Sequence, residues 1–252
     1  MKSVYFPSKM RKTASSAAFS GDRSGPWYYA RNAQAFLEDA ENPYALGRSL
    51  ADAHRRRWGA SPADGEVRSW EHSAPVLQEL LEEAHCTRDQ MVVLEYCLWN
   101  AGRIDALLCG VDRQKRLNAV LLELKRWQKC TIEESSLSRS VRVDFGHGFE
   151  RRAHPSVQVL GYRSCLREVL EKGERKGAER VRLSAYAYLH NCSPVSENIA
   201  NMRRVLYDRK FRPYLHAAPL FMEEHSATLQ RKIARRTERG RGEDVLRRLR
   251  AH

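Results

Sequence analysis

The stretch Arg103-Ile-Asp-Ala-Leu-Leu-Cys-Gly110, followed after a charged turn by Ala119-Val-Leu-Leu-Glu-Leu-Lys-Arg-Trp127, decides how this chain folds. Both runs are short and mainly apolar, as buried strands are, and the charged residues between them are typical of a hairpin tip. Three polar residues interrupt the runs: Asp105, Glu123 and Lys125. Because a charged group is costly to bury without a partner, these three side chains need a common explanation.

A hairpin with its tip at Gln114 places Asp105 opposite Glu123, since both are nine residues from the tip. Directly opposite residues in such a pair have Cβ atoms roughly 5 Å apart. Side chains alternate along a strand, so Glu123 and Lys125 share one face. The neighbouring Leu122 and Leu124 then point into the core.

Glu95 lies on the preceding predicted strand, 91–99, which ends at the turn Asn100-Ala101-Gly102. If this turn sets Cys97 opposite Asp105, Glu95 is diagonal to Asp105 on the same face. Carboxylates this close repel each other unless a cation bridges them, and hard oxygen ligands suit Mg²⁺ or Mn²⁺. The sequence therefore predicts a metal site.

The alternative for Glu123 and Lys125 is a cross-strand ion pair at a sheet edge, which is worth little and leaves Asp105 unexplained. The tripeptide (D/E)xK is itself a weak signal, because it recurs at Glu174-Lys176 and Asp208-Lys210. Only the copy at Glu123 is embedded in an apolar strand, which favours the metal site.

Around this hairpin the periodicity predicts a helix at 67–84, a helix at 155–172 opened by Pro155, and a strand at 181–190. Residues 128–154 are expected to form a long polar loop. The order α-β-β-β-α-β indicates an α/β fold, with a central mixed four-stranded sheet flanked by helices. We expect an arm and helical flank at 1–65, a core at 66–192, and a helical extension with a basic tail at 193–252.

The composition points to a polyanionic partner. Lys and Arg number 44 against 31 Asp and Glu, which gives a net charge of +13. Such an excess is typical of nucleic-acid binding, although an indifferent solvated surface is the alternative. The six cysteines form no CxxC pair, so a reducing cytoplasm without disulfides, zinc or iron–sulfur clusters is expected. No apolar run reaches the roughly 18–20 residues of a membrane span.

The pattern of Asp105 followed by Glu123-Leu-Lys125, after a helix and a hairpin, resembles the PD-(D/E)xK nuclease superfamily. Its RecB-like branch carries Gln-x-x-x-Tyr on the next helix, and Gln158-Val-Leu-Gly-Tyr162 stands at that place. The likeness covers roughly residues 66–250 and is greatest to the nuclease-like domain N-terminal to prokaryotic Schlafen-type helicases. Two features depart from it: Ile104 replaces the Pro of the motif, and no GxxxxGK[ST] helicase motif occurs.

The resemblance implies a restriction-endonuclease-like core and a metal-dependent nuclease that hydrolyses phosphodiester bonds of DNA or RNA. Asp105, Glu123 and the Leu124 carbonyl would hold Mg²⁺ or Mn²⁺, with Glu95 as a third carboxylate ligand. It also implies that Lys125 orients the attacking water and that Gln158 positions the nucleophile. Tyr162 would pack beside Gln158 or stack on a base. A helicase domain or subunit as partner, and a role in anti-phage defence, are implied in the same way.

Four arginines follow the hairpin in sequence, and we expect them to hold backbone phosphates: Arg139, Arg142, Arg151 and Arg152. A solvated loop is the alternative for any one of them. Two other readings of the whole chain stay open. One is a catalytically inactive nucleic-acid-binding module, and the other is a structural partner of a helicase.

Overall fold

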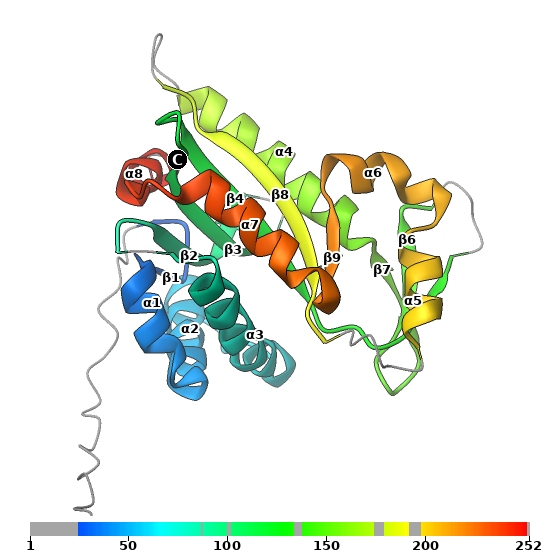
Figure 1. Ribbon diagram of the computed structural model, residues 1–252. Helices are drawn as coiled ribbons and strands as arrows, with labels where there is room; N and C mark the ends of the chain where they lie inside the picture. Colours follow the sequence, from blue (N-terminus) through cyan, green and yellow to red (C-terminus); the bar gives the residue numbers. More distant parts are fainter. Residues whose placement is uncertain are drawn as a thin grey trace, which may run out of the picture.

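The computed structural model describes residues 25–86, 88–99, 102–133, 138–173, 179–191 and 198–250. A six-stranded mixed sheet forms the centre, with helices on both faces and a second, three-stranded sheet at one end (Figure 1). The predicted α/β class is confirmed, and the central sheet has six strands instead of four. Most of the predicted N-terminal arm, Cys192 and the 174–176 tripeptide lie outside the described residues.

The central sheet draws one edge strand from each end of the chain. Its order is β1 (Tyr29–Asn32), β2 (Met91–Leu98), β3 (Gly102–Val111), β4 (Leu117–Lys125), β8 (Arg182–Leu189) and β9 (Leu220–Met222). The first four strands pair antiparallel, whereas β4 with β8 and β8 with β9 pair parallel. The predicted fourth strand, 181–190, is thus confirmed as β8.

Helices cover both faces of this sheet. One face packs against α1 (Ala33–Ala40), α2 (Pro43–Trp58), α3 (Asp64–Glu83) and α7 (Ser226–Thr237), and the other against α4 (Pro155–Gly173) and α8 (Gly242–Arg250). The predicted helices at 67–84 and 155–172 are confirmed as α3 and α4. The apolar stripe of α3 is buried throughout: Trp70, Ala74, Leu77, Leu80 and Leu81. In the described residues, no helix is both long enough and apolar enough to cross a membrane.

The β3–β4 hairpin has the predicted register. Its pairs run from Ala106 with Leu122 to Val111 with Leu117, so the tip is at Gln114 and the next positions outward are Asp105 and Glu123. Leu122 is buried in the core beneath α3, and Leu124 packs against the same cluster. The counted register is confirmed up to Ala106 with Leu122, where the pairing ends, and Asp105 lines a cavity on the α3 face that Glu123 does not line.

The β2–β3 register differs from the prediction. Cys97 pairs with Arg103 instead of Asp105, and the same count puts Glu95 directly opposite Asp105 instead of diagonal to it. The strand ends at Leu98, one residue earlier than predicted, and Trp99 is 89% exposed in the turn. Because β2 ends one residue earlier and β3 begins one residue earlier than predicted, each residue of β2 pairs two positions earlier in β3.

The predicted polar loop at 128–154 is wrong, because this segment forms the second sheet. Its strands are β5 (Cys130–Ile132), β6 (Ser140–Asp144) and β7 (Phe149–Ala153). Val141 and Val143 alternate with polar residues, and both are fully buried with Trp127 and Cys130 against α5 (Ile199–Leu206) and a 3₁₀ turn (Arg209–Phe211) before α6 (Arg212–Ala217). Two valines among many charges are a weak sequence signal, but they suffice once a neighbouring apolar surface covers them.

Candidate active site

Three carboxylates from neighbouring strands form the candidate site: Glu95 on β2, Asp105 on β3 and Glu123 on β4. Glu95 and Glu123 are buried, and Asp105 is half-buried. Burial raises the pKa of Glu95 well above its usual value, and Asp105 raises it further. Burial and Asp105 likewise raise the pKa of Glu123, to about 8. Asp105 thus interacts with both of its neighbours across the strands.

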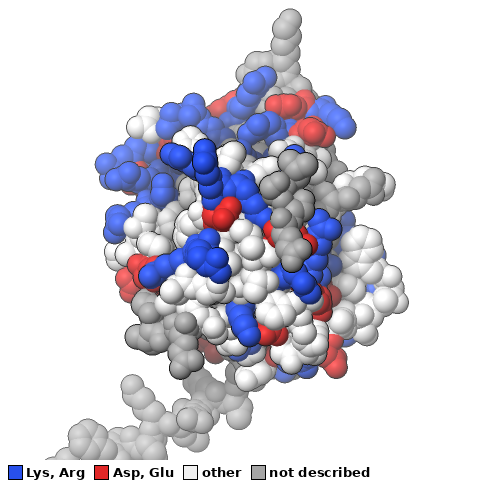
Figure 2. Space-filling view, turned by 90° about the vertical axis from the view of Figure 1, so that its right-hand side faces the viewer, with Lys and Arg blue, Asp and Glu red and all other residues white. Residues whose placement is uncertain are grey.

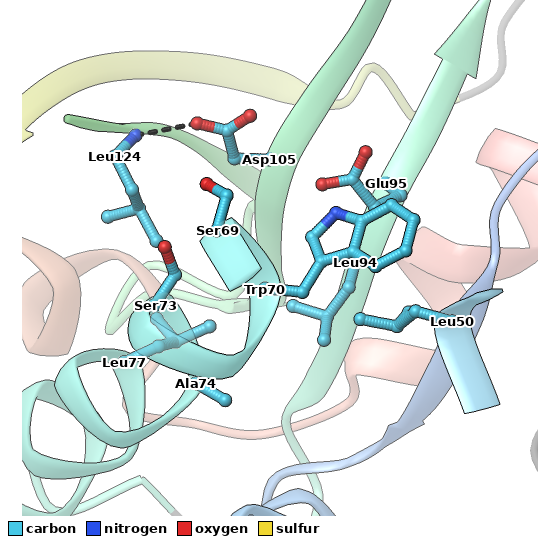
Figure 3. A pocket seen from close by; sticks show the side chains of 10 residues that line it. All are labelled: Leu50, Ser69, Trp70, Ser73, Ala74, Leu77, Leu94, Glu95, Asp105 and Leu124. Carbon is cyan, nitrogen blue, oxygen red and sulfur yellow. Dashed lines mark hydrogen bonds between the residues drawn. The ribbon is translucent and has the colours of Figure 1, made fainter. Parts of the chain in front are cut away.

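Asp105 is held by the backbone of β4. The Leu124 N–H donates to Asp105 Oδ2 at 2.8 Å (Figure 3). Leu124 can donate to Asp105 because its N–H points toward β3. The backbone of the next residue, Lys125, points the other way, and the Lys125 carbonyl accepts from the N–H of His190, which follows β8. The N–H and C=O of one strand residue point to the same side, so the predicted metal-ligating carbonyl of Leu124 also faces the β3 side.

Glu123 and Lys125 form a buried ion pair. The Lys125 ammonium contacts Glu123 Oε1, and the Glu123 side chain has no exposed surface. Beyond this contact, neither oxygen of Glu123 has a hydrogen-bond partner in the described part of the chain. Burial alone would lower the pKa of Lys125, but Glu123 and Asp105 outweigh it and raise that pKa. Lys125 therefore stays positively charged at any physiological pH.

Glu95 has a different partner. Its Oε2 accepts from Arg103 Nε at 2.7 Å, and the same guanidinium pairs with Glu66 of α3. Glu95 also has a φ of 54°, in the left-handed region that non-glycine residues rarely adopt. This conformation breaks the alternation of the strand, since the consecutive residues Leu94 and Glu95 both line one cavity. The strained backbone turns the Glu95 carboxylate toward Asp105 and α3.

That cavity has a volume of about 40 Å³, room for a few water molecules. Figure 3 shows Asp105, Glu95 and Leu124 above the hydroxyl-bearing Ser69 and Ser73 of α3. The two serines lie four residues apart on one helix face, and neither was predicted from the sequence as a site residue. Glu123 and Lys125 do not line the cavity.

The α4 pair approaches the acids from the opposite face of the sheet. Gln158 Nε2 donates to Tyr162 Oη at 2.9 Å, which confirms that the two residues share a helix face. Burial raises the pKa of Tyr162 to about 12, and Glu123 contributes to that shift. Gly102 makes room for this ring, because a Cβ there would meet Tyr162 Oη at 3.2 Å.

Three of the four predicted phosphate-binding arginines lie on the three-stranded sheet, between Lys125 and Gln158 in the sequence, and Arg139 immediately precedes β6. Arg142 and Arg151 are directly paired across β6 and β7, and both are exposed. Arg139 lies over the Tyr214 ring, while Arg152 lies over Phe145 and pairs with Glu150. Figure 2 shows Lys and Arg side chains spread over this end of the molecule.

The donors present suit a hard divalent cation only in part. Asp105, Glu123 and the Leu124 carbonyl supply oxygen, and the buried Glu123 carboxylate lacks hydrogen bonds that would satisfy it. Across the described ranges, however, no group of three or more His, Cys, Asp and Glu side chains is arranged to hold a metal. Glu95, expected as the third ligand, is already paired with Arg103. No family model, curated protein or solved structure matches this chain.

Burial raises the pKa of Asp105 as it does those of Glu95 and Glu123, and these three shifts predict how stability changes with pH. A carboxyl group whose pKa is higher in the folded state than in the unfolded state keeps its proton to higher pH when the protein is folded. The free energy of unfolding therefore falls as pH rises between the two pKa values. For Glu123 this window runs from about pH 4.5 to about 8. We expect urea unfolding of the metal-free protein to show decreasing stability over this range. Glu123→Gln should reduce the slope, and an unchanged slope would contradict the raised pKa.

Proposed function

We propose that this protein is a metal-dependent nuclease of the PD-(D/E)xK type that hydrolyses phosphodiester bonds in DNA or RNA. The observation that carries the proposal is the Glu123 carboxylate, fully buried, paired with Lys125 and facing Asp105 across the hairpin. Charges are seldom retained in an apolar sheet without a function, because burying them is costly. The likeness to the superfamily motif supports the same reading.

Asp105, Glu123 and the Leu124 carbonyl are the residues proposed to hold Mg²⁺ or Mn²⁺. Two carboxylates are enough, since Mg²⁺ in phosphate-processing sites is usually held by one or two carboxylates and completed by water and substrate oxygens. When bound, the ion lowers the pKa of a water molecule and neutralises charge on the phosphate. Glu95 is retained as a weaker candidate, because Arg103 occupies one of its oxygens.

Lys125 is proposed to act as a fixed positive charge instead of a general base. Its neighbours raise its pKa, so the ammonium keeps its proton and can orient a water molecule or stabilise charge that develops on the phosphate. Gln158, whose side chain is anchored by the Tyr162 hydroxyl, is proposed to position the nucleophile from the α4 side. These roles need no proton transfer from Lys125.

The test is a cleavage assay with purified protein, Mg²⁺ or Mn²⁺, and a panel of single- and double-stranded DNA and RNA. Calorimetry with Mn²⁺ runs beside it, because a catalytic site binds metal. Failure to cleave any substrate together with failure to bind Mn²⁺ would contradict the nuclease assignment. It would favour an inactive nucleic-acid-binding module, with or without a helicase partner.

The three-stranded sheet is proposed as a phosphate-binding surface of the nuclease. Arg142 and Arg151 stand directly opposite each other, an arrangement that repels unless an anion lies between them. Neither forms an ion pair with a carboxylate of the described residues. The exposed Phe149 ring lies 5.9 Å from the Arg142 guanidinium and 5.5 Å from the Lys129 ammonium, so aromatic and basic groups share this face.

Salt dependence tests this surface. We expect Arg142→Ala and Arg151→Ala each to weaken nucleic-acid binding and to reduce the slope of log K against log[salt] by about 1, as the loss of one phosphate contact does. Arg113→Ala, at the far tip of the β3–β4 hairpin, removes the same charge and is the matched control. Equal salt slopes for all three variants would show that this sheet does not contact the nucleic acid.

A further inference from the structure

A second, larger pocket opens beside the candidate site, where the end of β2 meets α2 and α4. Its volume is about 540 Å³, within the range of small-ligand sites. The lining side chains include Arg57, Trp58, Tyr96, Cys97, Trp99 and Val169. Two of them are large aromatic groups left open to solvent: Trp58 is 56% exposed and Trp99 is 89% exposed.

Exposed tryptophans are unusual, because an indole ring gains much free energy from burial. Most of the other aromatic rings packed around β2 are buried, Trp27, Tyr28 and Tyr96 among them. Two indoles at one pocket therefore indicate a surface that is covered when a ligand binds. The flat faces of the rings favour a flat, stacking ligand.

The pocket also carries a positive charge. Arg57 lies at the end of α2 with its guanidinium 5.7 Å from the Trp58 ring centre. Burial raises the pKa of Cys97 to about 11, and the positive charge of Arg57 partly offsets this rise. The Arg57 charge therefore acts on Cys97, which lines the same pocket. No carboxylate in the described ranges forms an ion pair with Arg57. A cation beside aromatic rings matches a ligand that has both a flat ring and an anionic group.

A short relay of side chains links this pocket to the acids. Trp58 Nε1 donates to Tyr28 Oη at 2.6 Å, and Arg103 Nη1 donates to the same oxygen at 3.2 Å. Arg103 Nε in turn donates to Glu95, the neighbour of Asp105. In β2 the pocket-lining Cys97 is only two residues beyond Glu95. A chain-like ligand in the pocket would thus extend toward the proposed catalytic centre.

We infer that this pocket binds an unpaired base of single-stranded nucleic acid, stacked on Trp58 and Trp99, with a flanking backbone phosphate on Arg57. The inference rests on the proposed function and specifies its substrate: a single strand, or a strand end opened from a duplex. Bases in a duplex stack on each other and cannot enter, whereas unpaired bases stack on aromatic side chains with little sequence preference. Charge complementarity with a chain of net charge +13 favours this occupant over an apolar peptide.

Binding in EDTA tests the inference apart from cleavage. A labelled oligo(dT), an oligo(U) of the same length and a blunt hairpin duplex are titrated with protein. We expect Trp58→Ala and Trp99→Ala each to weaken single-strand binding by about 5- to 150-fold, the range found when one base-stacking residue is removed. Duplex binding should change little, and Trp58→Phe should retain most of the affinity because it keeps a stacking ring.

Arg57 has a matched control one residue away. Arg57→Ala should lower the salt slope by about 1, whereas Arg56→Ala, an equal loss of charge at an exposed position of the same helix, should not.

The outcomes separate the two proposals. Parent-like single-strand binding by both tryptophan variants overturns the base pocket and leaves the nuclease assay unaffected. An equal loss for single strand and duplex also overturns it. Selective loss of single-strand binding supports the pocket, even if no cleavage is found with Mg²⁺ or Mn²⁺.

Discussion

Asp105→Asn is expected to lower Mg²⁺-dependent cleavage on the order of 1,000-fold while leaving the protein folded. Asparagine has nearly the same shape, and its side-chain oxygen can still accept the hydrogen bond that Leu124 N–H donates at 2.8 Å. The hairpin should therefore keep its register. What the substitution removes is the negative charge that a divalent cation and the neighbouring Lys125 require.

The measurement is the initial rate of cleavage on the substrate that the panel identifies, with Mn²⁺ affinity measured in parallel. Asp52→Asn, on the exposed surface of α2, is the matched control and should cleave within about twofold of the parent. Parent-like cleavage by Asp105→Asn would end the metal-ligand assignment. Lost cleavage with unchanged Mn²⁺ affinity would move Asp105 from metal ligand to another role.

Lys125→Met is expected to destabilise the protein near pH 8.5, because the buried Glu123 carboxyl loses the ammonium that lowers its pKa and must either take up a proton or carry an uncompensated charge. Methionine keeps most of the volume of the lysine side chain, so the loss reports charge and not a cavity. The effect should shrink as pH falls, since protonation of Glu123 removes the uncompensated charge. Urea unfolding at pH 5.5 and pH 8.5 measures both.

The double variant Glu123→Gln/Lys125→Met provides the control. It removes both charges, and it should recover much of the stability that Lys125→Met loses. Cleavage should stay absent in the single and the double variant alike. Recovery of stability without recovery of cleavage would separate the electrostatic role of the pair in folding from its proposed role in catalysis. Equal stability of Lys125→Met and parent at pH 8.5 would contradict the buried ion pair.

Local sequence patterns predict the β3–β4 hairpin and the register of its paired residues. The charged tip and the apolar arms leave one register that buries Leu122 and Leu124, because a slip of one residue would turn every side chain to the opposite face. The helices α3 and α4 follow from equally local signals: a long apolar stripe and a proline in the first turn. Local patterns suffice where one arrangement alone buries the apolar residues.

The rest of the candidate site is built by features that no sequence pattern predicts. Glu95 faces α3 because of a left-handed backbone that alternation does not predict, and its partner Arg103 comes from the next strand. The second sheet exists because its two valines meet the apolar surface of α5, which comes from a distant part of the chain. The Trp58–Trp99 pocket joins α2 to the end of β2. The second sheet and the pocket depend on contacts between segments far apart in sequence, whose free energy no local pattern records.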